Sequence, residues 1–97
     1  MSLSLLSQPY WYLYLLECQD GSIYTGIALD VHARFKQHQL GKGARYTHSH
    51  RPLRLLAVAE FTSRALAQRA EYQLKRYSAQ KKRLVAQSLS EGKVVCI

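Results

Sequence analysis

The chain has 97 residues, of which 47% are hydrophobic, and its 14 Lys and Arg against six Asp and Glu give a formal charge of +8. A chain of this length builds one domain with one modest core, and its hydrophobic content excludes an intrinsically disordered protein. A strongly positive field concentrates polyanions, so composition favours nucleic acid as the partner, with solubility or an acidic protein partner as the alternatives.

The cysteines and the apolar segments exclude further classes of protein. Cys18 and Cys96 lie far apart without CxxC spacing, which indicates free thiols of a cytoplasmic protein and not a disulfide framework or a zinc site. The longest apolar runs, 11–16 and 55–59, have the length of strands. A membrane-spanning helix needs about 18 apolar residues, so we expect a cytoplasmic protein with no membrane segment.

In chain order, residues 1–9 predict a flexible arm, residues 10–90 a single domain and residues 91–97 a tail. Two β-prone runs, 11–16 and 22–27, flank Asp20-Gly21 and predict a β-hairpin. Asp30 is placed to cap a helix that Gly41 ends.

The second half of the domain predicts a basic loop, a strand and two helices. The loop covers 41–52 and begins with Gly41-Lys42-Gly43, which we interpret as a flexible hinge. A third strand covers 53–61, and Ser63 and Ser78 are placed to cap helices over 64–76 and 79–89. The order ββαβαα predicts an α/β (α+β) fold, with a small three-stranded antiparallel or mixed sheet flanked by helices.

Polar side chains border the apolar faces of two predicted helices. Arg34 and His38 are one turn apart beside the inward-facing stripe of the first helix, so they either extend from the edge of the core or line a cleft. Glu71 borders the stripe of a later helix, where the alternative is a surface ion pair with Lys75 four residues on. Tyr12 and Tyr14 lie on one face of the first strand, which is ordinary for aromatic residues.

Taken together in order and spacing, these residues resemble the GIY-YIG endonuclease superfamily. Tyr12-Leu13-Tyr14 is similar to the first motif of the family and Tyr24-Thr25-Gly26 to the second, followed by Arg34, His38 and a distant Glu71. The segments 24–27, 38–44 and 69–72 resemble the small stand-alone bacterial YhbQ-type branch, and the resemblance extends from about Trp11 to Leu84.

The resemblance implies metal-dependent hydrolysis of phosphodiester bonds in DNA, with Mg²⁺ or Mn²⁺ and no small-molecule cofactor. It implies structural roles for Tyr12, which stands where the family name has Gly, and for Gly26, where a side chain would intrude. The catalytic residues that it implies are the two motif tyrosines, a phosphate-binding Arg, a His that orients it and a metal-binding Glu: Tyr14, Tyr24, Arg34, His38 and Glu71.

The physical chemistry of these residue types fits that reaction. A guanidinium group matches two phosphate oxygens at once, and a single carboxylate can hold a Mg²⁺ that keeps most of its waters. Tyr24 or its hydrogen-bonded neighbours are candidates to take the proton of the attacking water, although the pKa of a free Tyr, about 10, would have to fall. The chain contains no Asn, which many relatives use late in the domain, so Lys81, Lys82 or Arg83 are candidates to take its place.

The loop over 41–52 predicts a nucleic-acid-binding surface. Lys42, Arg45 and Arg51 are candidates to contact phosphates, and Tyr46 to stack on a base. His48 and His50 have the spacing of a metal pair, but nothing nearby in the sequence supplies further ligands. The alternatives to a DNA endonuclease are a weakly catalytic or non-catalytic nucleic-acid-binding module and an RNA-directed nuclease, and a partner protein is a candidate source of specificity.

Overall fold

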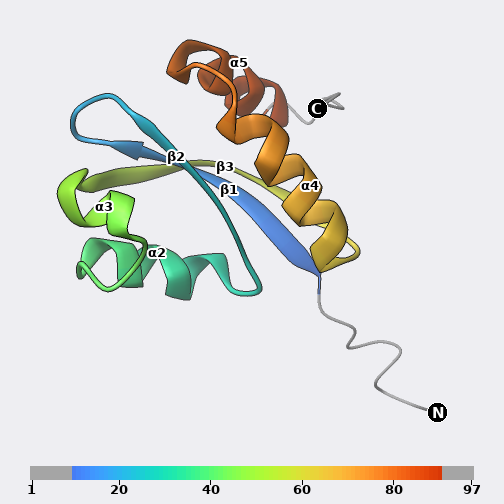
Figure 1. Cartoon of the computed structure of the whole chain (residues 1–97), viewed down its shortest axis with the longest axis horizontal. Helices are drawn as coiled ribbons and strands as arrows, with labels where there is room; N and C mark the ends of the chain where they lie inside the picture. Colours follow the sequence, from blue (N-terminus) through green and yellow to red (C-terminus); the bar gives the residue numbers. More distant parts are fainter. Residues whose placement is uncertain (1–9, 91–97) are drawn as a thin grey trace.

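An antiparallel sheet of three strands forms the centre of the computed structural model, which describes residues 10–90. The predicted arm and tail, with Cys96, lie outside the described residues. The strands are β1 (Trp11–Cys18), β2 (Ile23–Ala28) and β3 (Pro52–Phe61), in the order β2-β1-β3 (Figure 1). The predicted hairpin and third strand are therefore confirmed, and the sheet is antiparallel throughout.

Strand β1 lies in the middle of the sheet and is buried on both faces. Leu13 and Leu15 pack into the core on one face, and Tyr14 and Leu16 pack into the core on the other. A strand covered on both sides needs apolar side chains at every position, which explains why its sequence does not alternate.

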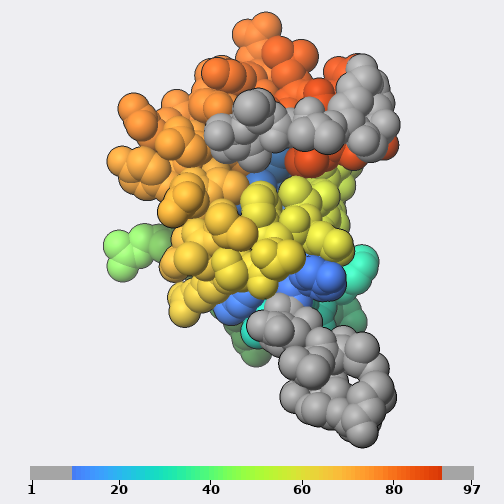
Figure 2. All heavy atoms as spheres, turned by 90° about the vertical axis from the view of Figure 1, so that its right-hand side faces the viewer, coloured from blue at the N-terminus to red at the C-terminus, as the bar shows by residue number. Residues whose placement is uncertain are grey.

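Two helices cover each face of the sheet. On one side lie α2 (Val31–Gln39) and α3 (Arg45–Ser49), and on the other lie α4 (Arg64–Lys75) and α5 (Ala79–Ser90) (Figure 1). Seen from the edge nearest α4, this helix and the end of β3 form one continuous surface with α5 above them (Figure 2). No helix in the part of the chain that the structure describes has the length and apolar character needed to cross a bilayer.

The predicted caps hold at the starts of three helices. The side chains of Asp30, Ser63 and Ser78 accept hydrogen bonds from the backbone three residues on, at 3.1, 3.2 and 3.1 Å. Each bond satisfies one of the amide groups that a first helical turn leaves free. Gly41 follows the end of α2 with a φ of +76°, a conformation that favours glycine.

Helix α3 corrects the predicted element order, which becomes ββααβαα instead of ββαβαα. Residues 45–49 lie in the segment that was predicted to be a loop. Five residues are too few to show helical periodicity, and basic and polar side chains hide the single buried position, Thr47.

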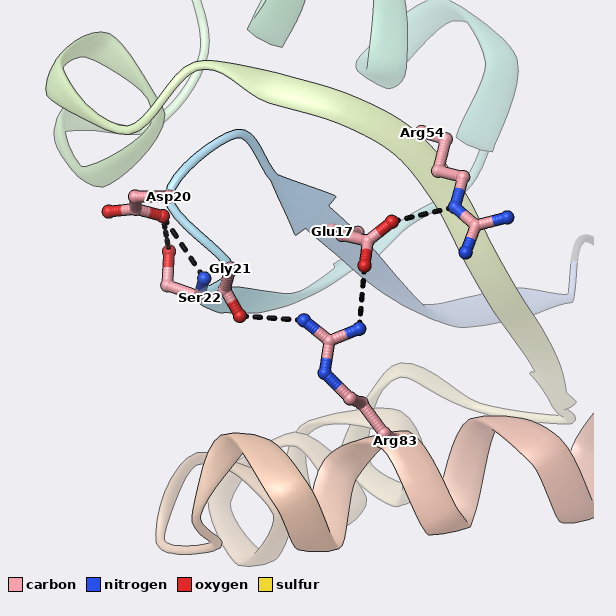
Figure 3. Close-up of polar contacts among 6 residues, drawn as sticks. All are labelled: Glu17, Asp20, Gly21, Ser22, Arg54 and Arg83. Carbon is pink, nitrogen blue, oxygen red and sulfur yellow. Dashed lines mark hydrogen bonds and ion pairs between the residues drawn. The ribbon is translucent and has the colours of Figure 1, made fainter.

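The C-terminal helix is tied to the hairpin by a partly buried carboxylate. Glu17 accepts hydrogen bonds from Arg54 Nε on β3 at 2.7 Å and from Arg83 Nη1 on α5 at 2.6 Å (Figure 3). The second nitrogen of Arg83 donates to the carbonyl of Gly21 at 2.7 Å. These bonds give Arg83 a structural role, and Lys81 lies over the ring of Tyr77, 4.0 Å from its centre.

Candidate active site

A chain of buried hydrogen bonds joins β1, α2 and α3. The Tyr14 hydroxyl lies 2.8 Å from His38 Nε2, and His38 Nδ1 lies 2.7 Å from the Thr47 hydroxyl. Thr47 in turn donates to the carbonyl of Ala44 at 2.9 Å. Tyr14, His38 and Thr47 are each at most 2% exposed, so the chain is closed to solvent.

The order of these bonds fixes the protonation of the histidine. The only hydroxyl proton of Thr47 goes to Ala44, so Thr47 can only accept from His38, and Nδ1 must carry the imidazole proton. Nε2 is then an acceptor, and the Tyr14 hydroxyl donates to it. The oxygen of Tyr14 is left with lone pairs that can accept a further hydrogen bond.

Burial keeps both members of the Tyr14–His38 pair neutral. Desolvation, helped by the charge of Arg34, lowers the pKa of His38 to about 4. Desolvation, helped by Tyr24, raises the pKa of Tyr14 to about 12, and Arg34 opposes this rise. The chain of hydrogen bonds is complete only when Tyr14 and His38 are both neutral, so the two pKa shifts favour the state in which it forms.

Tyr24 on β2 lies at the centre of a group of rings. Its centroid is 6.2 Å from that of Tyr14, 5.1 Å from that of His38 and 5.7 Å from that of Tyr46, on which it stacks. Tyr46 stacks in turn on His50 at 4.1 Å. Burial raises the pKa of Tyr24, while Lys75 and Arg34 lower it and Glu71 raises it further.

Two glycines make room for this group. A Cβ atom on Gly26 would lie 2.5 Å from the Tyr14 hydroxyl and 3.0 Å from the Tyr24 ring, which confirms the prediction that a side chain there would intrude. A Cβ atom on Gly43 would overlap the ring of His38. The interpretation of 41–43 as a flexible hinge is therefore wrong for Gly43, because its backbone packs directly on the buried imidazole.

Arg34 lies half-buried at the rim of this group. Its Nη1 donates to Gln37 Oε1 at 2.9 Å, and its charge acts on the hydroxyls of both Tyr14 and Tyr24. We expected His38 to orient Arg34, but both nitrogens of that ring are engaged by Tyr14 and Thr47, and Gln37 holds the guanidinium group instead.

Glu71 reaches the same tyrosines from α4, on the other side of the sheet. Its carboxylate lies 3.3 Å from Lys75 Nζ, so the ion pair that we considered as an alternative is present. Its side chain is only 20% exposed, and its charge raises the pKa of both Tyr14 and Tyr24. The ion pair therefore occurs together with an electrostatic effect of Glu71 on both tyrosines.

The side chains predicted to bind nucleic acid are exposed around α3. Lys42, Arg45, Tyr46 and Arg51 lie on this helix and the loops that flank it. Arg51 and His38 line one hollow of about 230 Å³, so the basic loop is adjacent to the tyrosine group. His50 instead pairs with Asp20 at 2.5 Å, and within residues 10–90 no group of three or more His, Cys, Asp or Glu is placed to hold a metal ion.

Sequence reasoning missed two buried threonines. Thr47 fixes the tautomer of His38, and Thr25 lines a pocket beside Tyr24. Neither has a local signal, because Thr47 lies in a helix too short to detect and Thr25 is an ordinary strand residue. The one sequence signal is that polar side chains, Tyr24 and Thr25, follow the apolar Ile23 within a strand.

A hairpin that carries two tyrosines, with an Arg, a His and a Glu on the flanking helices, is the arrangement that the sequence motifs indicated. The family model for the GIY-YIG catalytic domain matches residues 10–84, nearly the whole of the described domain. The chain therefore belongs to the GIY-YIG family.

Within this family the chain is similar to a group of bacterial proteins designated UPF0213. A UPF0213 protein of Cupriavidus pinatubonensis is 58% identical over 72 residues, which cover 74% of this chain and 80% of the relative. A UPF0213 protein of Halalkalibacterium halodurans is 51% identical over 71 residues, which cover 73% of this chain and 76% of the relative. These identities confirm the predicted YhbQ-type branch.

A solved structure supports the fold. The solution NMR structure of the UPF0213 protein BH0048 from Bacillus halodurans has a TM-score of 0.51 and 46% identity, and the match covers 80% of this chain and 83% of that one. It agrees with the predicted class of fold, a three-stranded antiparallel sheet flanked by helices.

Proposed function

We propose that this protein is a metal-dependent endonuclease that hydrolyses phosphodiester bonds in DNA. The observation that carries the proposal is that a guanidinium group and a carboxylate from helices on opposite faces of the sheet both act on the two motif tyrosines of the β1–β2 hairpin. Tyr14, Tyr24, Arg34 and Glu71 come from β1, β2, α2 and α4, and the charges of the last two act on both tyrosine hydroxyls. Membership of the GIY-YIG catalytic domain family supports a nuclease-type function.

Arg34 is proposed to hold the phosphate that is cut. Its guanidinium group offers a planar set of donors, of which one binds Gln37. The remaining donors match two non-bridging oxygens, and their fixed charge stabilises the negative charge that grows on the phosphate in the transition state.

Tyr24, in its phenolate form, is proposed to orient the attacking water and to take its proton. The Tyr14 hydroxyl proton is committed to His38, so the Tyr14 oxygen can only accept further hydrogen bonds, from Arg34 or from the water. Burial raises the pKa of Tyr24, but Lys75 and Arg34 lower it, and cationic charge beside the bound substrate would lower it further. The buried Tyr14–His38–Thr47 chain holds this acceptor in place.

Glu71 is proposed to hold the metal ion, Mg²⁺ or Mn²⁺. Magnesium usually keeps several waters and is bound by one or two carboxylates together with substrate phosphates. One half-buried carboxylate whose charge acts on both tyrosines fits this donor set, with Lys75 as its counter-ion in the metal-free protein. The metal would supply Lewis-acid stabilisation of the phosphoryl oxygens and of the leaving oxygen.

The exposed side chains around α3 are proposed to bind the DNA backbone and to guide a strand to Tyr24. Lys42, Arg45 and Arg51 would contact phosphates, which supply most of the affinity in such complexes. Tyr46 stacks on Tyr24 and on His50, and the residue as a whole remains 38% exposed, which leaves part of it free to contact a sugar or a base. A partner protein or the geometry of the DNA would then supply specificity.

The experiment that tests this function is incubation with plasmid DNA and Mg²⁺ or Mn²⁺, followed by the same reaction in EDTA. We expect nicked and linear products that require the metal, and a panel of duplex, nicked, flapped and branched substrates would show which structure is cut fastest. Binding without cleavage under every metal condition would establish the alternative, a nucleic-acid-binding module. The absence of a late Asn from the chain is the observation that favours that alternative.

A further inference from the structure

A second pocket lies at the outer edge of β2 and shares Tyr24 with the candidate active site. It encloses about 370 Å³. It is lined by Ile23, Tyr24, Thr25, Tyr46, Lys75 and Lys82. Tyr24 and Thr25 are neighbours on one strand and point to opposite faces of the sheet, so the pocket extends from the α3 side to the α4–α5 side.

Lys82 is a buried cation with donors to spare. It is 8% exposed, and its Nζ donates to the carbonyl of Ile23 at 3.0 Å. An ammonium group has three N–H donors, and this bond uses one. Burial and the nearby charge of Lys75 both lower the pKa of Lys82. Two ammonium groups that repel each other beside a pocket are stabilised when an anion lies between them.

Thr25 contributes a second donor with no partner. Its side chain is 1% exposed, and its hydroxyl has no hydrogen-bond partner within residues 10–90. Buried hydroxyl groups are nearly always bonded, so an unbonded one that lines a pocket marks a place for a ligand atom. None of the six lining residues carries a carboxylate, so the pocket is suited to an anion and not to a metal ion.

We propose that this pocket binds a second phosphate group of the nucleic-acid strand, next to the phosphate that is cut, through Lys75, Lys82 and Thr25. The inference rests on the proposed function. Lys75 links the two places, since its Nζ also pairs with Glu71, the proposed metal ligand. The phosphate would belong to the interior of a strand or to its 5′ end, because both present the same oxygen acceptors.

Binding in EDTA tests the pocket without any need for cleavage. The probe is a fluorescein-labelled duplex that contains a nick, and anisotropy measures its affinity for the wild type, Lys82→Met and Thr25→Val. We expect Lys82→Met to weaken binding about 10-fold and to reduce the slope of log K against log salt by about 1, as the loss of one phosphate contact does. Lys81→Met is the matched control, because Lys81 is the adjacent residue but is exposed on the ring of Tyr77, and it should leave that slope unchanged.

Thr25→Val keeps the test valid if Lys82→Met folds poorly. Valine has nearly the shape of threonine and removes only the unpartnered hydroxyl, so the variant should melt at or above the wild-type temperature while binding DNA several-fold more weakly. Wild-type affinity in both Thr25→Val and a folded Lys82→Met would overturn the proposal.

Neutral phosphates locate the group that enters the pocket. A series of probes carries one methylphosphonate at successive positions, and a further pair carries or lacks the 5′-phosphate at the nick. We expect that neutralising or removing one particular phosphate weakens binding to the wild type but not to Lys82→Met. The position of that phosphate shows whether the pocket binds an interior or a terminal phosphate. Equal losses for both proteins at every position would refute the pocket. If the protein shows this binding pattern but never cuts DNA, the nuclease proposal is wrong and the phosphate pocket is supported. If the protein cuts DNA but does not show the pattern, only the proposal of the phosphate pocket is wrong.

Discussion

The two faces of the sheet carry different kinds of functional side chain. On the α2–α3 face, Tyr14, His38 and Thr47 are buried, neutral and joined in a closed chain of hydrogen bonds. On the α4–α5 face, Glu71 and Lys75 are charged, partly exposed and held by one 3.3 Å ion pair. The first arrangement holds its side chains in place without burying a charge. In the second, a metal ion can take the place of Lys75 beside Glu71, and a phosphate can take the place of Glu71 beside Lys75.

This comparison teaches how a small domain can combine rigidity with exchangeable charge. A buried charged group needs an oppositely charged partner in the free protein, whereas two neutral groups that hydrogen-bond to each other need no counter-ion. Edge strand β2 separates the two arrangements, and Tyr24 is the residue that touches both. Variants of the closed Tyr14–His38–Thr47 chain should therefore lose stability, whereas variants of the exchangeable charged groups should lose activity.

The largest effect on activity is expected from Glu71→Gln. The amide has the size of the carboxylate but is a poor ligand for Mg²⁺, so cleavage should fall below detection while melting temperature and DNA affinity stay near wild type. Plasmid cleavage in Mg²⁺, with melts and anisotropy on the same samples, checks this. Glu60→Gln, an exposed glutamate on β3, is the control and should cut normally. Wild-type cleavage by Glu71→Gln would remove Glu71 from the metal site.

Arg34→Lys should cost the next largest amount, a rate loss of roughly 10²-fold or more. Lysine keeps the positive charge but cannot bind two phosphate oxygens in one plane, so this variant separates charge from geometry. Single-turnover cleavage measures the loss. The same exchange at Arg69, exposed on α4, should leave the rate unchanged. A fully active Arg34→Lys would show that the site needs only a cation there.

Tyr24→Phe and Tyr14→Phe compare a tyrosine outside the closed chain of hydrogen bonds with one inside it. Both remove one hydroxyl and keep the ring, and Tyr24→Phe should lose a rate similar to that of Arg34→Lys at nearly unchanged stability. Tyr14→Phe leaves a buried His38 nitrogen without its donor, so it should lower the free energy of unfolding by about 1–3 kcal/mol as well.

Denaturant melts and single-turnover rates on both proteins check this contrast, with Tyr72→Phe, 65% exposed on α4, as the control. Equal stability of the two variants would break the distinction between a closed and an open arrangement. Near-native rates in both Tyr24→Phe and Arg34→Lys would instead favour the nucleic-acid-binding module.

The smallest effect, on stability alone, is expected from pH. His38 binds a proton below pH 6.5 in the unfolded chain but only below about 4 in the folded protein. Between these values the unfolded state binds more protons, so stability should be full above pH 6.5 and fall by up to about 3 kcal/mol as pH drops toward 4. Urea melts across this range and NMR titration of the imidazole measure the loss.

His32→Asn, which removes an exposed histidine from the same helix, should keep the pH dependence of the wild type. The NMR spectra should also show the proton on Nδ1 of His38. An imidazole that titrates near pH 6.5 would contradict a closed, desolvated chain.

Much of this architecture was predictable because its signals are local. The hairpin follows from two β-prone runs around Asp20-Gly21, and the helix starts follow from Asp30, Ser63 and Ser78, whose side chains cap them. The role of Gly26 was predictable because its place in the motif indicates that a side chain would not fit, whichever residue packs against it. Helix α3 was not predictable, because five mostly exposed residues are too few to show the periodic pattern of apolar residues that marks a helix.

The sequence by itself determined the class of fold, the family and the set of residue types at the candidate site, since order and spacing along the chain carry that information. The tertiary structure alone decided which of these side chains meet. Only the fold could show that Thr47 sets the tautomer of His38, that Gly43 supports its ring and that Lys82, and not Lys81 or Arg83, enters the pocket beside Tyr24. Contacts between residues far apart in sequence depend on how the helices lie against the sheet, and no local pattern encodes that.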